Sequence, residues 1–122
     1  MNVALRQRIR LPLKVWRAAF AACALAVLVL ALIPGEVTIS GTGWDKTNHL
    51  LAFSVLAVLG LQAYPGRLVV VLMGLLVYGG LIEILQFFTP DRAAEWTDLV
   101  ADSVGLGLGC GVHRLAKVLV RQ

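Results

Sequence analysis

Four apolar runs, separated by short polar connections, make up most of the chain. The third run has the ~20 residues that a helix needs to cross the hydrocarbon core of a bilayer. Pro and Gly follow the first two runs, and neither residue continues a helix readily. The pattern therefore predicts an all-α integral membrane protein, a four-helix antiparallel bundle that forms a single domain over residues 1–122. The spans are expected at about 16–33, 48–64, 68–88 and 98–118.

Two of these runs, Leu50 to Tyr64 and Leu99 to Val112, are short for a span. At ~1.5 Å per residue, each covers only about 21 to 23 Å of the ~30 Å hydrocarbon core. The polar residues at their outer ends are then drawn below the lipid headgroups, or the bilayer thins locally. Either case predicts a polar notch in the outer leaflet.

The composition also separates the chain from soluble domains. Hydrophobic residues make up 59% of the sequence, charged residues only 15%, and the mean hydropathy is +0.84. The net charge of +4 does not indicate a nucleic-acid partner, because the basic residues lie at the ends of the apolar runs and not on a mixed basic and aromatic surface. Cys23 and Cys110 fall inside predicted spans without the spacing of a metal site, so we expect them to be small packing residues.

The distribution of positive charge predicts the orientation of the bundle. Nine of the eleven Lys and Arg residues fall on the side that holds both termini, and only Lys46 and Arg92 fall on the other side. By the positive-inside rule, both termini are cytoplasmic. The basic segment before Ala18 also resembles the start of a signal peptide. However, the apolar run is too long for one and no small-x-small cleavage site follows it, so a retained span is predicted.

Polar residues in and beside the apolar runs share helix faces. These faces hold Asp45 with His49, then Gly79 with Glu83 and Gln86, and then Asp98 with Asp102, Gly105 and Gly109. Ionisable groups inside a membrane are costly and usually face the interior of a bundle, whereas glycines let helix backbones approach closely. We therefore expect the three faces to turn toward one another and to meet at one depth in the outer leaflet.

The converging side chains predict a site for an anionic amphiphile. Glu83, Asp102 and His49 are the candidate catalytic groups, because one carboxyl group can hold a proton while another is ionised and an imidazole shares it. Lys46 and Arg92 are expected to hold a phosphate or carboxylate headgroup. The remaining candidate substrate-binding residues are Gln86, Asp98 and Asp45. No metal motif of recognised spacing is present, so no metal site is predicted, although three carboxylates and an imidazole can hold a divalent cation.

Each candidate also has a purely structural interpretation. Helix capping accounts for Asp98, contact with lipid phosphates for Arg92, and an interfacial hydrogen bond for His49. Glu83 and Asp102 need partners even in a structural role, because an isolated charge is costly to bury. The alternative function is therefore a non-catalytic membrane module whose polar network fixes helix packing and supports assembly with a partner. Proton or cation movement is less favoured, since the polar residues stop in the outer half.

Taken in order, Asp45-Lys46-x-x-His49, Glu83-x-x-Gln86, Arg92 and Asp98-x-x-x-Asp102-x-x-Gly105 resemble the motifs of the VanZ-like family of small bacterial membrane proteins. The resemblance extends from Trp44 to about Gly109 and departs from the family's pattern at Asp102, where asparagine is common. The family takes its name from a protein associated with resistance to teicoplanin. The resemblance implies a multi-pass protein of the bacterial cytoplasmic (inner) membrane that acts at the outer face, near cell-envelope precursors. It supplies no established reaction.

Together, these features predict a protein that binds an anionic cell-envelope lipid or a lipid-linked precursor. Whether it also processes that lipid, and so whether it is an enzyme, stays open, as does any cofactor. A homo-oligomer or a partner membrane protein is also left open, and no nucleic acid is expected as a partner.

Overall fold

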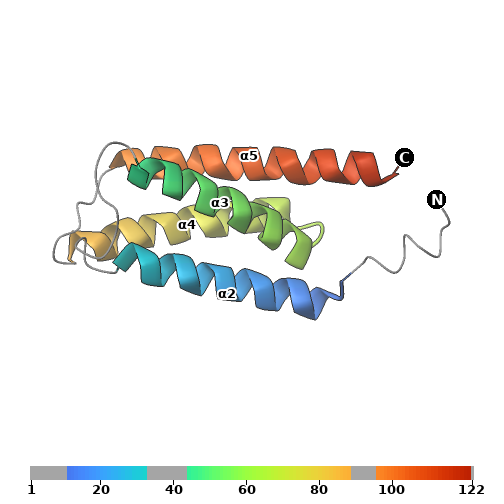
Figure 1. Cartoon of the computed structure of the whole chain (residues 1–122), viewed down its shortest axis with the longest axis horizontal. Helices are drawn as coiled ribbons and strands as arrows, with labels where there is room; N and C mark the ends of the chain where they lie inside the picture. The colour runs from blue at the N-terminus through green and yellow to red at the C-terminus, as the bar shows by residue number, and fades with distance from the viewer. Residues whose placement is uncertain (1–10, 33–43, 89–95, 122) are drawn as a thin grey trace.

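The computed structural model describes residues 11–32, 44–88 and 96–121, and at 44–46 and 121 it describes the backbone alone. Within these ranges the chain forms four helices and no strand, which confirms the all-α prediction. The helices are α2 (Leu13–Leu32), α3 (Trp44–Ala63), α4 (Leu68–Phe87) and α5 (Trp96–Arg121). Successive helices run in opposite directions, so the start of α2 and the end of α5 lie at the same end of the bundle (Figure 1).

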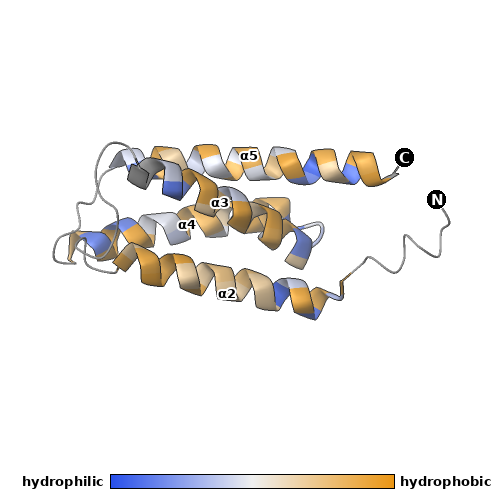
Figure 2. Ribbon diagram, viewed as in Figure 1, coloured by the Kyte–Doolittle hydropathy of each residue, from blue (hydrophilic) through white to orange (hydrophobic). Residues whose placement is uncertain are grey.

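Three of these helices are long and apolar enough to cross a membrane. They are α2, α4 and α5, with mean hydropathies of 2.2, 2.5 and 1.2 over their best windows. The described part of α3 forms a shorter apolar helix, Thr47–Ala63. Apolar residues cover the middle of the bundle, and polar residues gather toward its ends (Figure 2). The chain therefore has the architecture of a membrane protein, while the cytoplasmic placement of its termini stays a prediction.

The fourth apolar run lies within a longer helix, as the expected span of about 98–118 requires. Helix α5 has 26 residues, which correspond to about 39 Å at ~1.5 Å per residue. The helix begins before the apolar run, at Trp96, and continues past it through His113 to Arg121. Polar residues at both ends thus extend the helix beyond its apolar part.

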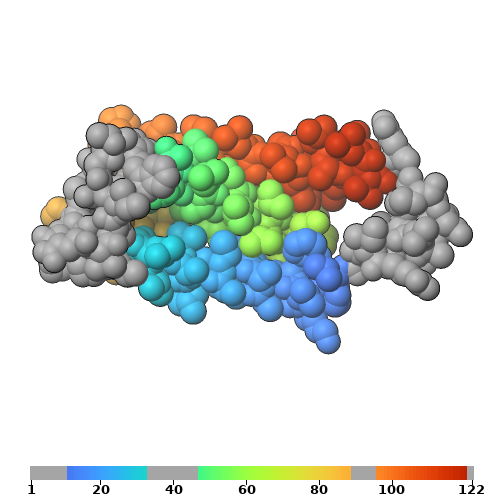
Figure 3. Space-filling view, in the orientation of Figure 1, coloured from blue at the N-terminus to red at the C-terminus, as the bar shows by residue number. Residues whose placement is uncertain are grey.

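The core of the bundle is small and lies between α3, α4 and α5. Its fully buried side chains include Phe53 and Leu56 from α3 and Ile82 from α4. Helix α2 buries no residue and lies along one edge of the molecule, with α5 along the opposite edge (Figure 3). Many large apolar side chains on the outside, such as Val69 and Leu108, are exposed. In a membrane protein these side chains face the acyl chains.

Two glycines of α5 allow it to pack directly against the backbone of α3. A Cβ atom on Gly105 would lie 2.5 Å from the carbonyl oxygen of Leu50, and one on Gly109 would overlap the carbonyl oxygen of Ser54. The Ser54 hydroxyl is within hydrogen-bond distance of the carbonyl oxygens of Leu50, at 2.8 Å, and of Gly105, at 3.0 Å. The small-x-x-x-small spacing of Gly105 and Gly109 therefore produces the close helix contact that it predicts.

A tight turn joins α3 to α4 at the end of the bundle that holds the start of α2. The amide of Arg67 donates a hydrogen bond to the carbonyl oxygen of Tyr64 at 3.2 Å. Gly66 has a φ of 77°, a left-handed conformation that glycine adopts without steric cost. Pro65 and Gly66 thus reverse the chain within a few residues, as their sequence predicts.

We expect Gly105→Ala and Gly109→Ala each to lower the free energy of unfolding by about 1–3 kcal/mol, because the added methyl group overpacks the contact between α3 and α5. The measurement is thermal unfolding in detergent. Gly107→Ala and Gly111→Ala are matched controls on the same helix, since a Cβ at either position meets nothing within 4 Å. Equal losses in all four variants would contradict this account of the glycines.

Candidate functional site

Four ionisable side chains, His49, Glu83, Asp98 and Asp102, form a polar cluster at the end of the bundle opposite the start of α2. His49 comes from α3, Glu83 from the end of α4, and the two aspartates from the start of α5. Counted along their helices, these residues lie roughly 3 to 9 Å from the nearest helix end at ~1.5 Å per residue. The structure thus brings together all three of the candidate catalytic residues and Asp98.

A short contact in the polar cluster joins His49 to Asp102. The His49 Nδ1 atom lies 2.8 Å from Asp102 Oδ1, and the Asp102 side chain is 0% exposed. When the carboxylate is ionised it only accepts hydrogen bonds, and Nδ1 is then the donor. In the neutral imidazole this leaves Nε2 as the atom with a lone pair, and Nε2 lies 3.9 Å from Asp98 Oδ2.

Two neighbours fix the positions of the His49 ring and the Asp102 carboxylate. The Phe53 ring lies parallel to that of His49, with ring centroids 6.5 Å apart and an interplanar angle of 7°. Gly79 of α4 makes room for Asp102, because a Cβ at this glycine would lie only 2.7 Å from Asp102 Oδ2. No described residue forms a hydrogen bond with Oδ2. Packing therefore holds this carboxylate against α4 while Oδ1 binds His49.

Glu83 and Asp98 complete the polar cluster around the second nitrogen of His49. The two side chains are buried, with 8% and 5% of their residue surface exposed. One ligand atom from each of His49, Glu83 and Asp98 can be chosen so that all three atoms lie within 4.8 Å of one another. Among the described residues, these are the side chains that can hold a metal ion together.

Gln86 is buried beside the polar cluster but makes its described hydrogen bond elsewhere. Its Nε2 donates to the carbonyl oxygen of Ala31 on α2 at 3.0 Å. The side-chain amide therefore links α4 to α2, and its Oε1 atom forms no hydrogen bond with a described residue. The predicted substrate-binding role of Gln86 stays a prediction. Asp45, Lys46 and Arg92 have side chains outside the described residues, so their substrate-binding roles stay predictions.

A second histidine has quite different surroundings. His113 is buried in α5 near the other end of the bundle, and its Nε2 lies 3.4 Å from Gln62 Oε1. A neutral amide is its described partner, in place of the carboxylates that surround His49. This contact favours a structural role for His113.

Two residues near the polar cluster, Phe53 and Ser54, have roles that the sequence analysis does not predict. Phe53 follows His49 by four residues, so helical spacing alone could have placed it beside that ring. Ser54 carries no such signal, because a serine in an apolar helix commonly bonds to its own backbone. Its additional contact with Gly105 depends on the close approach of two helices that are distant in the sequence.

Most of the chain matches a known protein family. The model of the family described as VanZ/LLP1 matches residues 3–117 of the chain. The chain belongs to this family. The match confirms the resemblance inferred from the motifs around His49, Glu83 and Asp98. Neither the curated proteins nor the solved structures include a significant match to this VanZ/LLP1 protein.

At Asp102 the sequence resemblance implies an asparagine in the pattern of the VanZ-like family. The Asp102 Oδ1 atom lies 2.8 Å from His49 Nδ1. The carbonyl oxygen of an asparagine can accept the same bond, so either residue positions the imidazole with the same tautomer. The carboxylate adds a negative charge, which makes the bond to an imidazolium stronger.

A double-mutant cycle should separate the His49–Asp102 bond from ordinary helix packing. For His49→Ala and Asp102→Ala in this VanZ/LLP1 protein, we expect a coupling energy of about 1–3 kcal/mol, because the bond is short and charge-assisted. The measurement is the change in unfolding free energy in detergent. The control cycle uses Gln62→Ala and His113→Ala, whose neutral 3.4 Å contact should give less than about 1 kcal/mol. Equal coupling in the two cycles would contradict a charged bond.

Proposed function

We propose that this VanZ/LLP1 protein binds the headgroup of an anionic cell-envelope lipid, or of a lipid-linked precursor, at the polar cluster. The proposal is supported chiefly by the meeting of His49, Glu83 and Asp102 from three helices at one end of the bundle. Side chains a few ångströms below a helix end lie near the boundary between headgroups and acyl chains. A lipid headgroup reaches this depth without leaving the membrane.

The surroundings of the polar cluster favour a headgroup site over a cation pathway. Below the cluster, the described core consists of apolar side chains such as Phe53, Leu75 and Leu106. An ion pathway needs polar groups that continue across the membrane. In the part of the chain that the structure describes, the next buried ionisable group toward the other end is His113, beyond this core. The site therefore suits a ligand that enters and leaves by the same face.

The chemistry at this site would be proton transfer. Asp102 holds His49 with Nδ1 protonated, so Nε2 can accept a proton from a hydroxyl group or a water molecule and return it later. Glu83 is the third candidate acid or base, and Asp98 would stabilise His49 once Nε2 has taken up the proton. Lys46 and Arg92 are the proposed contacts for the phosphate, since charge-assisted hydrogen bonds suit such a group. By the predicted orientation, all this takes place at the outer face of the bacterial cytoplasmic membrane.

The second candidate is a non-catalytic module in which the same bonds fix helix packing. The His49–Asp102 bond joins α3 to α5, and the Gln86 amide joins α4 to α2. Each of these bonds would hold one pair of helices in register. The function would then lie in assembly with a partner membrane protein or a second copy.

Substitution of Glu83→Gln and Asp102→Ala tests the first candidate. We expect either change to reduce the anionic lipid that copurifies with the protein by about tenfold or more, since each removes a group from the polar cluster; tenfold corresponds to ~1.4 kcal/mol. Native mass spectrometry of the detergent-purified protein measures this lipid. Ser103→Ala is the control, because Ser103 is exposed beside Asp102 and bonds only to its own helix at Leu99.

Complementation of a deletion strain provides the second readout. Both variants should fail to restore the phenotype while they fold in normal yield. Stable variants that restore it fully would contradict the catalytic form of the proposal. A large loss of folded protein in both variants would instead support the structural module.

A further inference from the structure

We propose that the polar cluster also binds a divalent transition-metal ion, such as Zn²⁺ or Mn²⁺, through His49, Glu83 and Asp98. This inference rests on the proposed function, because the ion would connect the carboxylates to an anionic headgroup. An imidazole nitrogen and two carboxylate oxygens are a ligand set that suits these ions better than Ca²⁺ or Mg²⁺.

The ligand atoms are close to the positions that a metal ion requires. The ligand atoms of His49, Glu83 and Asp98 lie within 4.8 Å of one another. The distance between His49 Nε2 and Asp98 Oδ2 is 3.9 Å. Ligands about 2.0–2.2 Å from a shared ion lie roughly 3.3–4.2 Å apart. Side-chain rotations that move the oxygens by less than about 1 Å therefore complete the site.

His49 is already held in the form that binds a metal. Metal-bound histidines usually donate the hydrogen bond of their second ring nitrogen to a carboxylate or carbonyl oxygen. Asp102 is fully buried and accepts this bond from Nδ1 at 2.8 Å, so Nε2 faces the other carboxylates. The Oδ2 atom of Asp102 has no hydrogen bond from a described residue, and a positive ion behind His49 would stabilise this buried charge.

The charge of the polar cluster supports the same conclusion. Three buried carboxylates surround one imidazole, whereas every Lys and Arg whose side chain the structure describes lies toward the opposite end of the bundle. Buried carboxylates are normally paired or bound to metal. Their combined charge would repel an anionic headgroup, and a divalent ion would offset two of the three negative charges and so weaken this repulsion. When the ion occupies Nε2, His49 acts as a ligand and not as a base.

The test is metal binding to the full-length protein in detergent. After treatment with a chelator, titration with ZnCl₂ or MnCl₂ should reach about one ion per chain by elemental analysis. His49→Gln and Asp98→Asn should weaken binding at least tenfold, and Asp102→Asn should do so to a similar or smaller extent, because it acts through His49. His113→Gln is the matched control and should bind like the wild type. The absorption bands of Co²⁺ provide a second measurement of ligation in each variant that folds.

Two results would overturn the metal site: no bound ion in the wild type, or equal loss in the His49 and His113 variants. Either result leaves the proposed function standing if chelator-treated protein still retains its anionic lipid. If the ion binds but no lipid does, the site exists and the proposed function is wrong.

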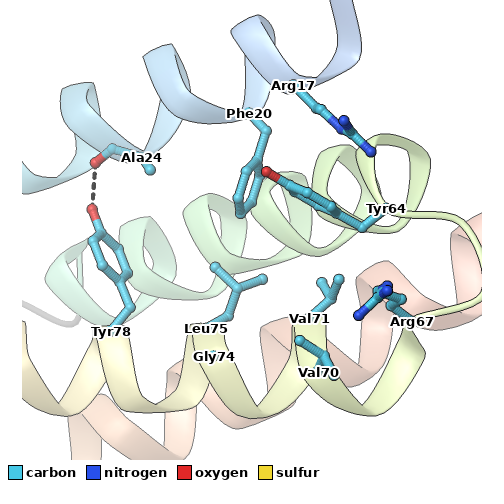
Figure 4. Close-up of a pocket in the computed structure, with 10 residues that line it drawn as sticks. All are labelled: Arg17, Phe20, Ala24, Tyr64, Arg67, Val70, Val71, Gly74, Leu75 and Tyr78. Carbon is cyan, nitrogen blue, oxygen red and sulfur yellow. Dashed lines mark hydrogen bonds between the residues drawn. The ribbon is translucent and has the colours of Figure 1, made fainter. Parts of the chain in front are cut away.

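We also infer that a separate cavity binds one acyl chain of an anionic phospholipid. The cavity lies between α2 and α4, away from the polar cluster, and has a volume of about 590 Å³ (Figure 4). Small-molecule sites typically measure roughly 300–1,000 Å³. Its walls are mainly apolar and include Phe20, Val70, Leu75 and Tyr78. The hydroxyl of Tyr78 donates to the carbonyl oxygen of Ala24, so the inner end presents little free polar surface.

The cavity has the length and the charge that a phospholipid requires. From Arg67, before the first residue of α4, to Tyr78 the helix rises about 16 Å, which is roughly half of the ~30 Å hydrocarbon core. The guanidinium of Arg17 lies over the ring of Tyr64 at 4.9 Å, and its Nε donates to the carbonyl oxygen of Ala63 at 3.1 Å. Its Nη groups form no hydrogen bond with a described residue and, with Arg67, can bind a phosphate.

These features favour a membrane lipid over a soluble phosphate. A free phosphate needs the two arginines but not the apolar depth behind them, whereas one leaflet supplies both parts in a single molecule. Basic pockets between membrane helices commonly bind anionic headgroups in this way. By the predicted orientation, this lipid belongs to the cytoplasmic leaflet.

Substitution of a glycine tests whether an acyl chain enters the cavity. Gly74 lines the cavity, and a Cβ placed on it meets nothing within 4 Å. Gly74→Leu should therefore fill the space without a clash and reduce retention of phosphatidylglycerol at least tenfold in nanodiscs. Gly80→Leu is the matched control on the same helix, because its Cβ is equally unhindered but lies outside the lining. Native mass spectrometry counts the retained lipids.

Arg17→Gln together with Arg67→Gln should remove the preference for phosphatidylglycerol over phosphatidylcholine. Equal retention of these two lipids by the wild type, or equal retention by the Gly74 and Gly80 variants, would contradict the inference. Inorganic phosphate that displaces the lipid at millimolar concentration would show that the arginines bind the anion alone. Because Asp102→Ala leaves this cavity and its lipid intact, the loss of lipid at the polar cluster is counted in the background of Arg17→Gln and Arg67→Gln.

Discussion

The cost of placing carboxylates in apolar surroundings determines how this bundle is arranged. The Asp102 side chain is fully buried. Among the described residues, its hydrogen-bond partner is His49. That bond requires α3 and α5 to approach closely, and Gly105 and Gly109 make the approach sterically allowed. The glycine contact and the polar cluster are therefore parts of one arrangement, in which the small residues bring the charged ones within bonding distance.

The bundle is polar at both ends, but in two different ways. At one end, histidine and carboxylates from three helices face one another in the interior. At the other end, Arg17 and Arg67 line a cavity between α2 and α4. The membership of the VanZ/LLP1 family agrees with a membrane protein. A protein built in this way presents an acidic site to one leaflet and a basic one to the other.

The sequence predicts the helices and the inward faces well, because both follow from local patterns. Hydrophobic runs and the cost of buried charge suffice to place His49, Glu83 and Asp102 on facing sides. The bonding partners within the site are harder to predict, since they depend on how far each helix is rotated. Gln86 shares the face of Glu83 but binds Ala31 of α2, and no spacing in the sequence indicates this choice. The cavity beside α2 is likewise set by the packing of whole helices, which residue patterns do not specify.

Helix α2 differs from its neighbours in that it buries none of its residues. Its attachment consists of one apolar face and a few bonds to main-chain oxygens, including those made by Tyr78 and Gln86. Segments with few buried contacts separate from a fold at the lowest free-energy cost. The boundary between α2 and α4 is thus where separation of two helices would expose few buried side chains, and it is also where the cavity lies.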